Sequence, residues 1–139
     1  MINLIYRPKM KNDTIDLLSA CMGTNEKKEI LSEFRRYQDK DSRKLLGKII
    51  DNNLVGLIGI EFIFVKEVEL LHIAVKSKYR RQGIGESMIK DFIKKKKIEK
   101  MEAETDKEAV NFYIKIDFDV KSLGEKYPGV ERFKCIWKG

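Results

Sequence analysis

The turn YRRQGIG at residues 79–85 carries two glycines and two arginines, and it directly follows the apolar run LLHIAV at residues 70–75. After the turn, apolar residues recur at helical spacing, at Ile84, Met88, Ile89, Phe92 and Ile93. This pattern predicts a buried strand, a tight turn and an amphipathic helix. A strand-like run at residues 100–105 completes a strand–helix–strand unit, which indicates a local parallel strand pair.

The remaining apolar pattern predicts the α/β class, with a mixed, mostly antiparallel sheet flanked by helices. Three strand-like runs between residues 44 and 75 are joined by short polar turns, so they are expected to form an antiparallel meander. Pro8 should end the first strand, because proline cannot donate to a ladder. The expected order is β-α-α-β-β-β-α-β-α-β-β, at residues 2–7, 14–22, 25–38, 44–50, 54–64, 68–75, 84–97, 100–105, 106–116, 118–123 and 131–137.

Size and charge narrow the possible functions. A chain of 139 residues fits one domain, taken as residues 1–139. The net charge of +7 favours a polyanionic partner: nucleic acid, an anionic membrane surface or a phosphorylated cofactor. The lysine run at 94–97 has no interleaved aromatic residues, which argues against nucleic acid.

Targeting and metal signals are equally sparse in the sequence. Cys21 and Cys135 are far apart and form no CxxC motif, so neither a metal nor a redox centre is expected. The chain has no apolar stretch of 18 residues, and its apolar start is too short for a signal peptide. We therefore expect a cytoplasmic protein without a membrane partner.

The glycine turn itself suits a pyrophosphate. A helix N-terminus exposes unpaired N–H groups, glycines let the backbone approach a phosphate, and Arg80 and Arg81 add charged donors. The common nucleotide loops do not match, because GxxxxGK[ST] is absent and GIGESM lacks the third glycine of GxGxxG. From these residues alone, a plain strand-to-helix turn with solvated arginines remains an equal alternative.

The sequence RRQGIG resembles the (Q/R)xxGx(G/A) motif of the GNAT family of N-acetyltransferases. The run HIAV before the motif and A-x-x-F-Y at residues 109–113 after it occur in the family's order, and the resemblance covers nearly the whole chain. It implies an acetyl-CoA-dependent N-acetyltransferase in which a primary amine attacks the thioester directly. A non-catalytic acyl-CoA-binding module of the same fold is the alternative.

The resemblance also implies a set of cofactor-binding residues. The turn would hold the pyrophosphate of coenzyme A, and the fourth strand would bind the pantetheine arm in a gap beside the fifth strand. Many members have an asparagine at the position of Asp106, and an acid there lacks the amide donor. The implied residues are Ile73, Ala74, Val75, Arg80, Arg81, Gln82, Gly83, Ile84, Gly85 and Asp106. No metal is implied.

For catalysis, the resemblance places Tyr113 as the acid that protonates the leaving thiolate; a core aromatic role is the alternative. Glu69 is the first candidate for the base, because the histone-acetyltransferase branch carries its glutamate five residues before the position of Ala74. His72 is the rival, since its ordinary pKa suits base work. A bound water, or no dedicated base, also remains open.

The acceptor is not determined by the sequence. In the family, the first two helices and the loop between the last two strands shape that site, and both segments vary. A small-molecule amine and a peptide amine are both compatible, and a homodimer is possible. Asp117 replaces a common glycine before Phe118, but aspartate tolerates the left-handed conformation that such a turn needs.

Overall fold

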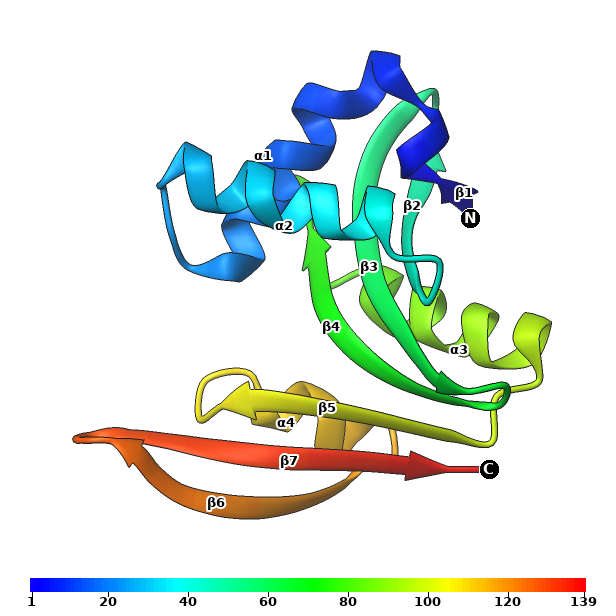
Figure 1. Ribbon diagram of the computed structural model, residues 1–139. Helices are drawn as coiled ribbons and strands as arrows, with labels where there is room; N and C mark the ends of the chain where they lie inside the picture. The colour runs from blue at the N-terminus through cyan, green and yellow to red at the C-terminus, as the bar shows by residue number, and fades with distance from the viewer.

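A seven-stranded sheet in the order β1-β2-β3-β4-β5-β7-β6 runs through the protein, described by a computed structural model of residues 1–139 (Figure 1). β4 and β5 are parallel, and all other neighbours are antiparallel. The strands are β1 (Ile2–Asn3), β2 (Arg43–Ile50), β3 (Asn53–Phe64), β4 (Glu67–Val75), β5 (Lys100–Asp106), β6 (Asp119–Tyr127) and β7 (Val130–Lys138). The predicted mixed, mostly antiparallel sheet and its element order are confirmed.

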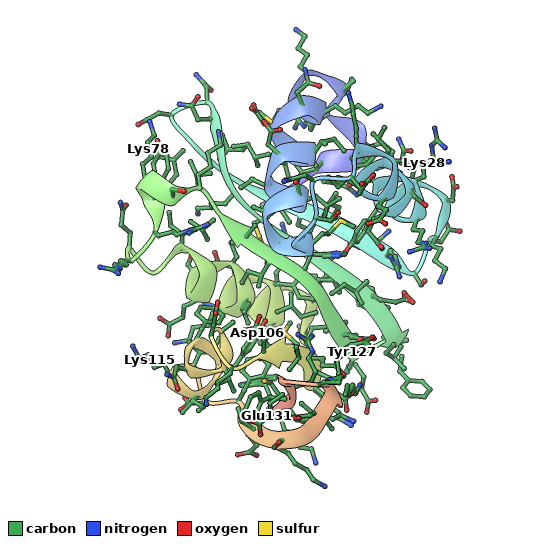
Figure 2. The ribbon with its side chains drawn as sticks, turned by 90° about the vertical axis from the view of Figure 1, so that its left-hand side faces the viewer. Lys28, Lys78, Asp106, Lys115, Tyr127 and Glu131 are labelled. Carbon is green, nitrogen blue, oxygen red and sulfur yellow. The ribbon has the colours of Figure 1, made fainter.

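Helices cover both faces of the sheet (Figure 1 and Figure 2). The helices are α1 (Lys11–Met22), α2 (Lys27–Asp39), α3 (Ile84–Lys96) and α4 (Val110–Lys115). One apolar core joins α1 and α2 to β2, β3 and β4, and a second joins α3 and α4 to β3, β4, β5 and β7. None of these helices is both long and apolar enough to span a membrane.

All the predicted helices and strands are present, but several boundaries differ. The first helix begins at Lys11 rather than at residue 14, and β6 continues to Tyr127 rather than to residue 123. The first strand stops at Asn3, because the chain turns into short 3-10 helices at Leu4–Tyr6 and Pro8–Met10. The helix predicted over 106–116 begins only at Val110, because Asp106 pairs with β7 as the last residue of β5 and residues 107–109 form a turn.

The separation of β4 from β5 is the feature of the fold that positions the site. The two strands pair only from Glu67↔Lys100 to Leu70↔Ala103. Beyond Leu70, β4 continues to Val75 and pairs with β3 alone, with Leu71 as an extra residue in a β-bulge. Figure 1 shows the carboxyl ends of β4 and β5 diverging. Backbone groups on one edge of β4 are therefore available to a ligand.

Candidate active site

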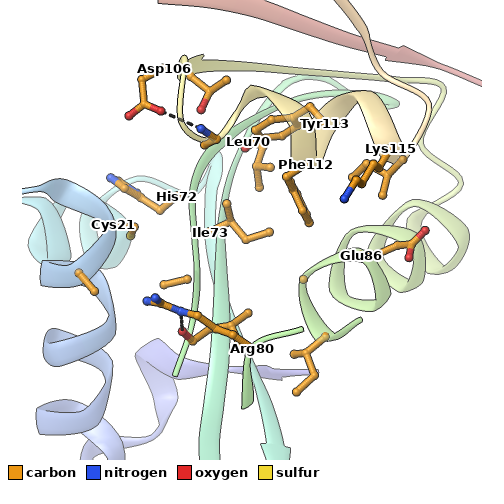
Figure 3. A pocket seen from close by; sticks show the side chains of 18 of the residues that line it. Cys21, Leu70, His72, Ile73, Arg80, Glu86, Asp106, Phe112, Tyr113 and Lys115 are labelled. Atoms are coloured by element: carbon orange, nitrogen blue, oxygen red, sulfur yellow. Dashed lines mark hydrogen bonds between the residues drawn. The ribbon is translucent and has the colours of Figure 1, made fainter. Parts of the chain in front are cut away.

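A cavity of about 860 Å³ opens where β4 and β5 part (Figure 3). It is lined by the end of α1, the second half of β4, the glycine turn, the start of α3, the end of β5 and α4. Ligand sites in α/β proteins commonly lie at the carboxyl ends of strands, where neighbouring strands diverge. Most of the predicted site residues line this cavity.

The glycine turn leads into the first turn of α3 at one end of this cavity. Gly83 is the N-cap of α3 with φ 76°, and Arg81 also has a positive φ of 62°. The first α3 amide with a helical acceptor is that of Ser87, which donates to the Gly83 carbonyl at 2.9 Å. The amides of residues 84–86 precede it, so they have no acceptor within the helix and suit phosphate oxygens.

The side chains of the turn have separate positions. Arg80 donates from Nε to the Val75 carbonyl at 3.0 Å and so ties the turn to the end of β4 (Figure 3). Arg81 lines the cavity as well. Gln82 is exposed, donates to the Lys78 carbonyl at 3.3 Å and does not line the cavity. Of the turn residues assigned to the cofactor, only Gln82 lies outside the cavity wall.

The two positions of the turn require glycine for different physical reasons. Gly83 adopts a left-handed conformation that residues with a side chain rarely accept. Gly85 has an ordinary φ, but a Cβ there would lie 3.3 Å from the Phe112 ring. The packing of α4 against α3 is therefore a second reason for glycine at position 85, and the sequence predicted only the first, the approach of a phosphate to the backbone.

On β4, Ile73, Ala74 and Val75 line the cavity as the resemblance implied. The thiol of Cys21, at the end of α1, lies near the backbone amide of Ile73 and donates to the Leu18 carbonyl at 3.3 Å. Burial raises the pKa of the Cys21 thiol to about 12, so the thiol is protonated and unreactive at neutral pH.

Tyr113 is buried, with 5% of its surface exposed, and it lines the cavity. Its ring makes edge contacts with Phe112 and Phe118, at centroid distances of 5.2 and 5.3 Å. Burial raises the pKa of its hydroxyl, so the group is protonated at neutral pH. Both the acid role and the core role are compatible with this position.

Glu69 adjoins the cavity but is not part of its wall. In the strand register, Glu69 lies opposite Glu61 of β3 and opposite Glu102 of β5, in the half of β4 that pairs with β5. No cation contacts its carboxylate, and burial, followed by the charges of Glu61 and Glu102, raises its pKa. His72, by contrast, lines the cavity directly.

Asp106 lines the cavity and also supports α4. Its Oδ1 accepts a hydrogen bond from the Ala109 amide at 2.9 Å, which holds the turn into the helix. Asp117 has φ 69°, so the left-handed conformation expected at this position is present. Neither departure from the family pattern disturbs the local backbone.

Two contacts at this cavity were not predicted from the sequence. Phe112 packs on Gly85, and Tyr37 of α2 hydrogen-bonds to His72 from behind the wall. Tyr37 was visible only as one member of an apolar helical pattern. No local signal links it to a residue 35 positions away.

The parted parallel strands β4 and β5 and the glycine turn that follows β4 thus border one cavity. The chain belongs to the acetyltransferase (GNAT) family, whose model matches residues 11–118. It is 31% identical over 85 residues to an uncharacterized N-acetyltransferase in the lysA 3′ region of Bacillus methanolicus, which covers 61% of this chain and 71% of the relative.

Solved structures show the same fold. An aminoglycoside 6′-N-acetyltransferase complexed with coenzyme A superposes with a TM-score of 0.80 and 16% identity, over 95% of this chain and 92% of that chain. The aminoglycoside 6′-N-acetyltransferase from Enterococcus faecium superposes with a TM-score of 0.77 and 17% identity, over 95% of this chain and 92% of that chain. A GNAT family acetyltransferase from Elizabethkingia anophelis with acetyl-CoA bound superposes with a TM-score of 0.66 and 20% identity, over 89% of each chain.

Proposed function

We propose that the protein transfers an acetyl group from acetyl-CoA to a primary amine. The observation that carries this proposal is the parting of β4 and β5 after Leu70 and Ala103, which opens a cavity that ends at the unpaired amides of α3. The family membership and the acetyl-CoA and coenzyme A complexes of structural neighbours support the same cofactor.

The residues present fit coenzyme A. Its pyrophosphate would be held by the amides of residues 84–86 and by Arg80 and Arg81, since these groups place positive potential at one end of the cavity. Its pantetheine arm would hydrogen-bond to the free edge of β4 at residues 73–75, as an added strand would. Gln82, outside the wall, contributes less than the other turn residues.

Acetyl-CoA supplies an activated acetyl thioester, whose carbonyl carbon forms a bond to the amine nitrogen while its carbon–sulfur bond breaks. Tyr113 gives its proton to the departing sulfur, because its hydroxyl is protonated at neutral pH and belongs to a residue that lines the cavity. Glu69 takes the proton from the amine, directly or through a water, and its raised pKa makes it a better base than an ordinary glutamate.

The charges around Glu69 favour a cationic acceptor. Glu61, Glu69 and Glu102 lie opposite one another on adjacent strands. Glu61 is paired with Arg43, and Glu102 is paired with Lys100 and Lys134, whereas Glu69 has no cation partner. An ammonium group at Glu69 would relieve this repulsion. A cationic amine is therefore favoured as the acceptor, and the aminoglycoside acetyltransferases among the structural neighbours make an aminosugar the first one to test.

The test separates binding from turnover. Acetyl-CoA should raise the melting midpoint of the purified protein, because it binds the native state, and duplex DNA should not. Release of the coenzyme A thiol is then measured with kanamycin, spermidine and a lysine-containing peptide. Binding without thiol release for any amine would favour the non-catalytic acyl-CoA-binding module instead.

A further inference from the structure

His72 is the only histidine in the chain, and it lies at the boundary between the cavity and α2. Figure 3 shows His72 and Cys21 on one side of β4, with Ile73 and Phe112 on the other side. The His72 side faces the first two helices, and the Ile73 side faces the glycine turn and α4. His72 therefore lies on the side of β4 where an acceptor, rather than the cofactor, would bind.

Tyr37 of α2 contacts this histidine from behind. The Tyr37 hydroxyl lies 2.5 Å from His72 Nδ1, and the tyrosine is 97% buried, with 3% of its surface exposed. Gly59 on β3 makes this contact possible, because a Cβ at position 59 would overlap the Tyr37 hydroxyl and lie 3.2 Å from Nδ1. A strand glycine here leaves the space that the tyrosine–histidine pair occupies.

The burial of Tyr37 determines the direction of this hydrogen bond. A buried hydroxyl that fails to donate loses free energy, and His72 Nδ1 is the only hydrogen-bond partner of the Tyr37 hydroxyl. The hydroxyl therefore donates and Nδ1 accepts. In a neutral imidazole whose Nδ1 is the acceptor, the proton is on Nε2. The ring nitrogen left for the cavity is then a donor.

The groups around the pair favour the neutral histidine. Burial lowers the pKa of His72, with Glu33 raising it and Arg43 lowering it to a smaller extent. Burial also raises the pKa of Tyr37, so its hydroxyl stays protonated. The titratable groups that act on the pair, together with Tyr37 itself, lie on four elements: Glu33 and Tyr37 on α2, Arg43 on β2, Glu61 on β3 and Cys21 on α1.

Arg43 also restrains the pair from the side. Its guanidinium lies 5.3 Å from the centroid of the Tyr37 ring and donates to Glu33 at 2.6 Å and to Glu61 at 2.9 Å. Only 13% of the Arg43 side chain is exposed. These contacts connect α2 to β2 and β3 beside the pair, so Tyr37 has little freedom to rotate away.

We propose that Tyr37 holds His72 in the Nε2–H tautomer, so that His72 is a hydrogen-bond donor to an oxygen of the acceptor substrate beside its reacting amine. Tyr37 is a positioning residue, and His72 is a specificity residue rather than the base. The role of His72 toward a substrate rests on the proposed acetyl transfer, whereas the tautomer of His72 rests on the contact with Tyr37. It predicts a preference for amines that carry a neighbouring hydroxyl or carbonyl oxygen.

The tautomer is tested by nitrogen-15 NMR of the labelled protein, where a single histidine removes any assignment ambiguity. We expect Nδ1 to show an unprotonated, hydrogen-bonded nitrogen and Nε2 a protonated one. Tyr37→Phe should give a tautomer mixture and a histidine pKa closer to its ordinary value. A protonated Nδ1 in the native protein, or a spectrum unchanged by Tyr37→Phe, overturns the inference with or without turnover.

The specificity role is tested by comparing ethanolamine with propylamine, which differ by a hydroxyl for a methyl. His72→Leu should lower kcat/KM for ethanolamine about 10-fold more than for propylamine, the cost of one lost hydrogen bond. His72→Gln, which keeps a donor, should recover most of that difference. Tyr127→Phe, at an exposed tyrosine, is the control. Equal losses for both amines overturn the donor role.

Failure of the proposed function gives a different result. If no amine releases the coenzyme A thiol although acetyl-CoA binds, acetyl transfer is refuted. The NMR spectra of the native and Tyr37→Phe proteins still decide the tautomer in that case.

Discussion

The ring of Phe112 stands edge-on to the ring of Tyr113, with their centroids 5.2 Å apart. Phe112 also lies against Gly85, so this one residue of α4 connects the glycine turn to the candidate acid. Packing, rather than a hydrogen bond, fixes the relative positions of the two chemical functions. The cofactor end and the catalytic end of the cavity are therefore expected to respond together to changes in this contact.

Gly85→Val tests that connection. The branched side chain would displace Phe112 and disturb the amides of residues 84–86, so acetyl-CoA affinity should fall at least about 10-fold. Gly85→Ala should lose less, because one methyl needs only a shift of a few tenths of an ångström. Isothermal titration calorimetry measures both affinities. Native affinity in a folded Gly85→Val protein would contradict the phosphate assignment.

Tyr113→Phe should leave acetyl-CoA affinity unchanged and slow the chemical step on the order of 100-fold, as expected for a positioned acid. The ring and its contacts with Phe112 and Phe118 remain, so the melting midpoint should hardly move. Single-turnover kinetics with a saturating amine measures the step. A native rate in this variant would leave Tyr113 with a packing role only.

Asp106 is expected to act through both charge and structure. Asp106→Asn keeps the oxygen that accepts from the Ala109 amide and removes a negative charge from the cavity, so coenzyme A should bind modestly more tightly. Asp106→Ala loses the oxygen and should reduce the free energy of unfolding by about 1 kcal/mol, as for other lost hydrogen bonds. Calorimetric titration and urea unfolding measure these effects. Weaker coenzyme A binding by Asp106→Asn would mean that the charge does not oppose the cofactor.

Glu69→Gln should lower the acetylation rate mainly below the pKa of the acceptor amine, with partial recovery at high pH. A base works only when deprotonated, and the pKa of Glu69 is raised, so the native rate should fall as pH drops through that pKa. At high pH the free amine becomes abundant and needs no base. The pH–rate profiles of both proteins check this. A native profile for Glu69→Gln, beside a lost ionisation in His72→Gln, would assign the base to His72.

Glu69 should also influence stability with a definite sign. Its folded pKa is raised, so the stability it contributes is present below its unfolded pKa and is lost as pH rises through the folded pKa. Glu69→Gln should therefore gain stability relative to the native protein between acidic and neutral pH. Urea unfolding at both pH values measures this change.

Glu104 provides the matched control of opposite sign. Hydrogen bonding to Lys126 and Arg132 lowers the pKa of Glu104, so its contribution is present above the unfolded pKa and lost as pH falls. Glu104→Gln should accordingly lose stability at neutral pH relative to acidic pH. The same sign for both variants would refute the electrostatic account of Glu69.

The sequence by itself determined the parts of this protein that depend on neighbours in the chain. Alternating and helical apolar patterns gave the element order, and the glycine turn before an amphipathic helix predicted an anion-binding helix start. The left-handed conformation at Asp117 followed from local chemistry as well. Such features need only a few consecutive residues, so periodicity and turn chemistry are sufficient to predict them.

Tertiary structure alone decided which distant side chains meet. The parting of β4 from β5 after Leu70 requires the full sheet register. The contact of Tyr37 with His72 requires a glycine on a third element, Gly59. Glu69 became a carboxylate with a raised pKa because register sets it between Glu61 and Glu102. These effects depend on through-space distances between strands and helices, which no local pattern specifies.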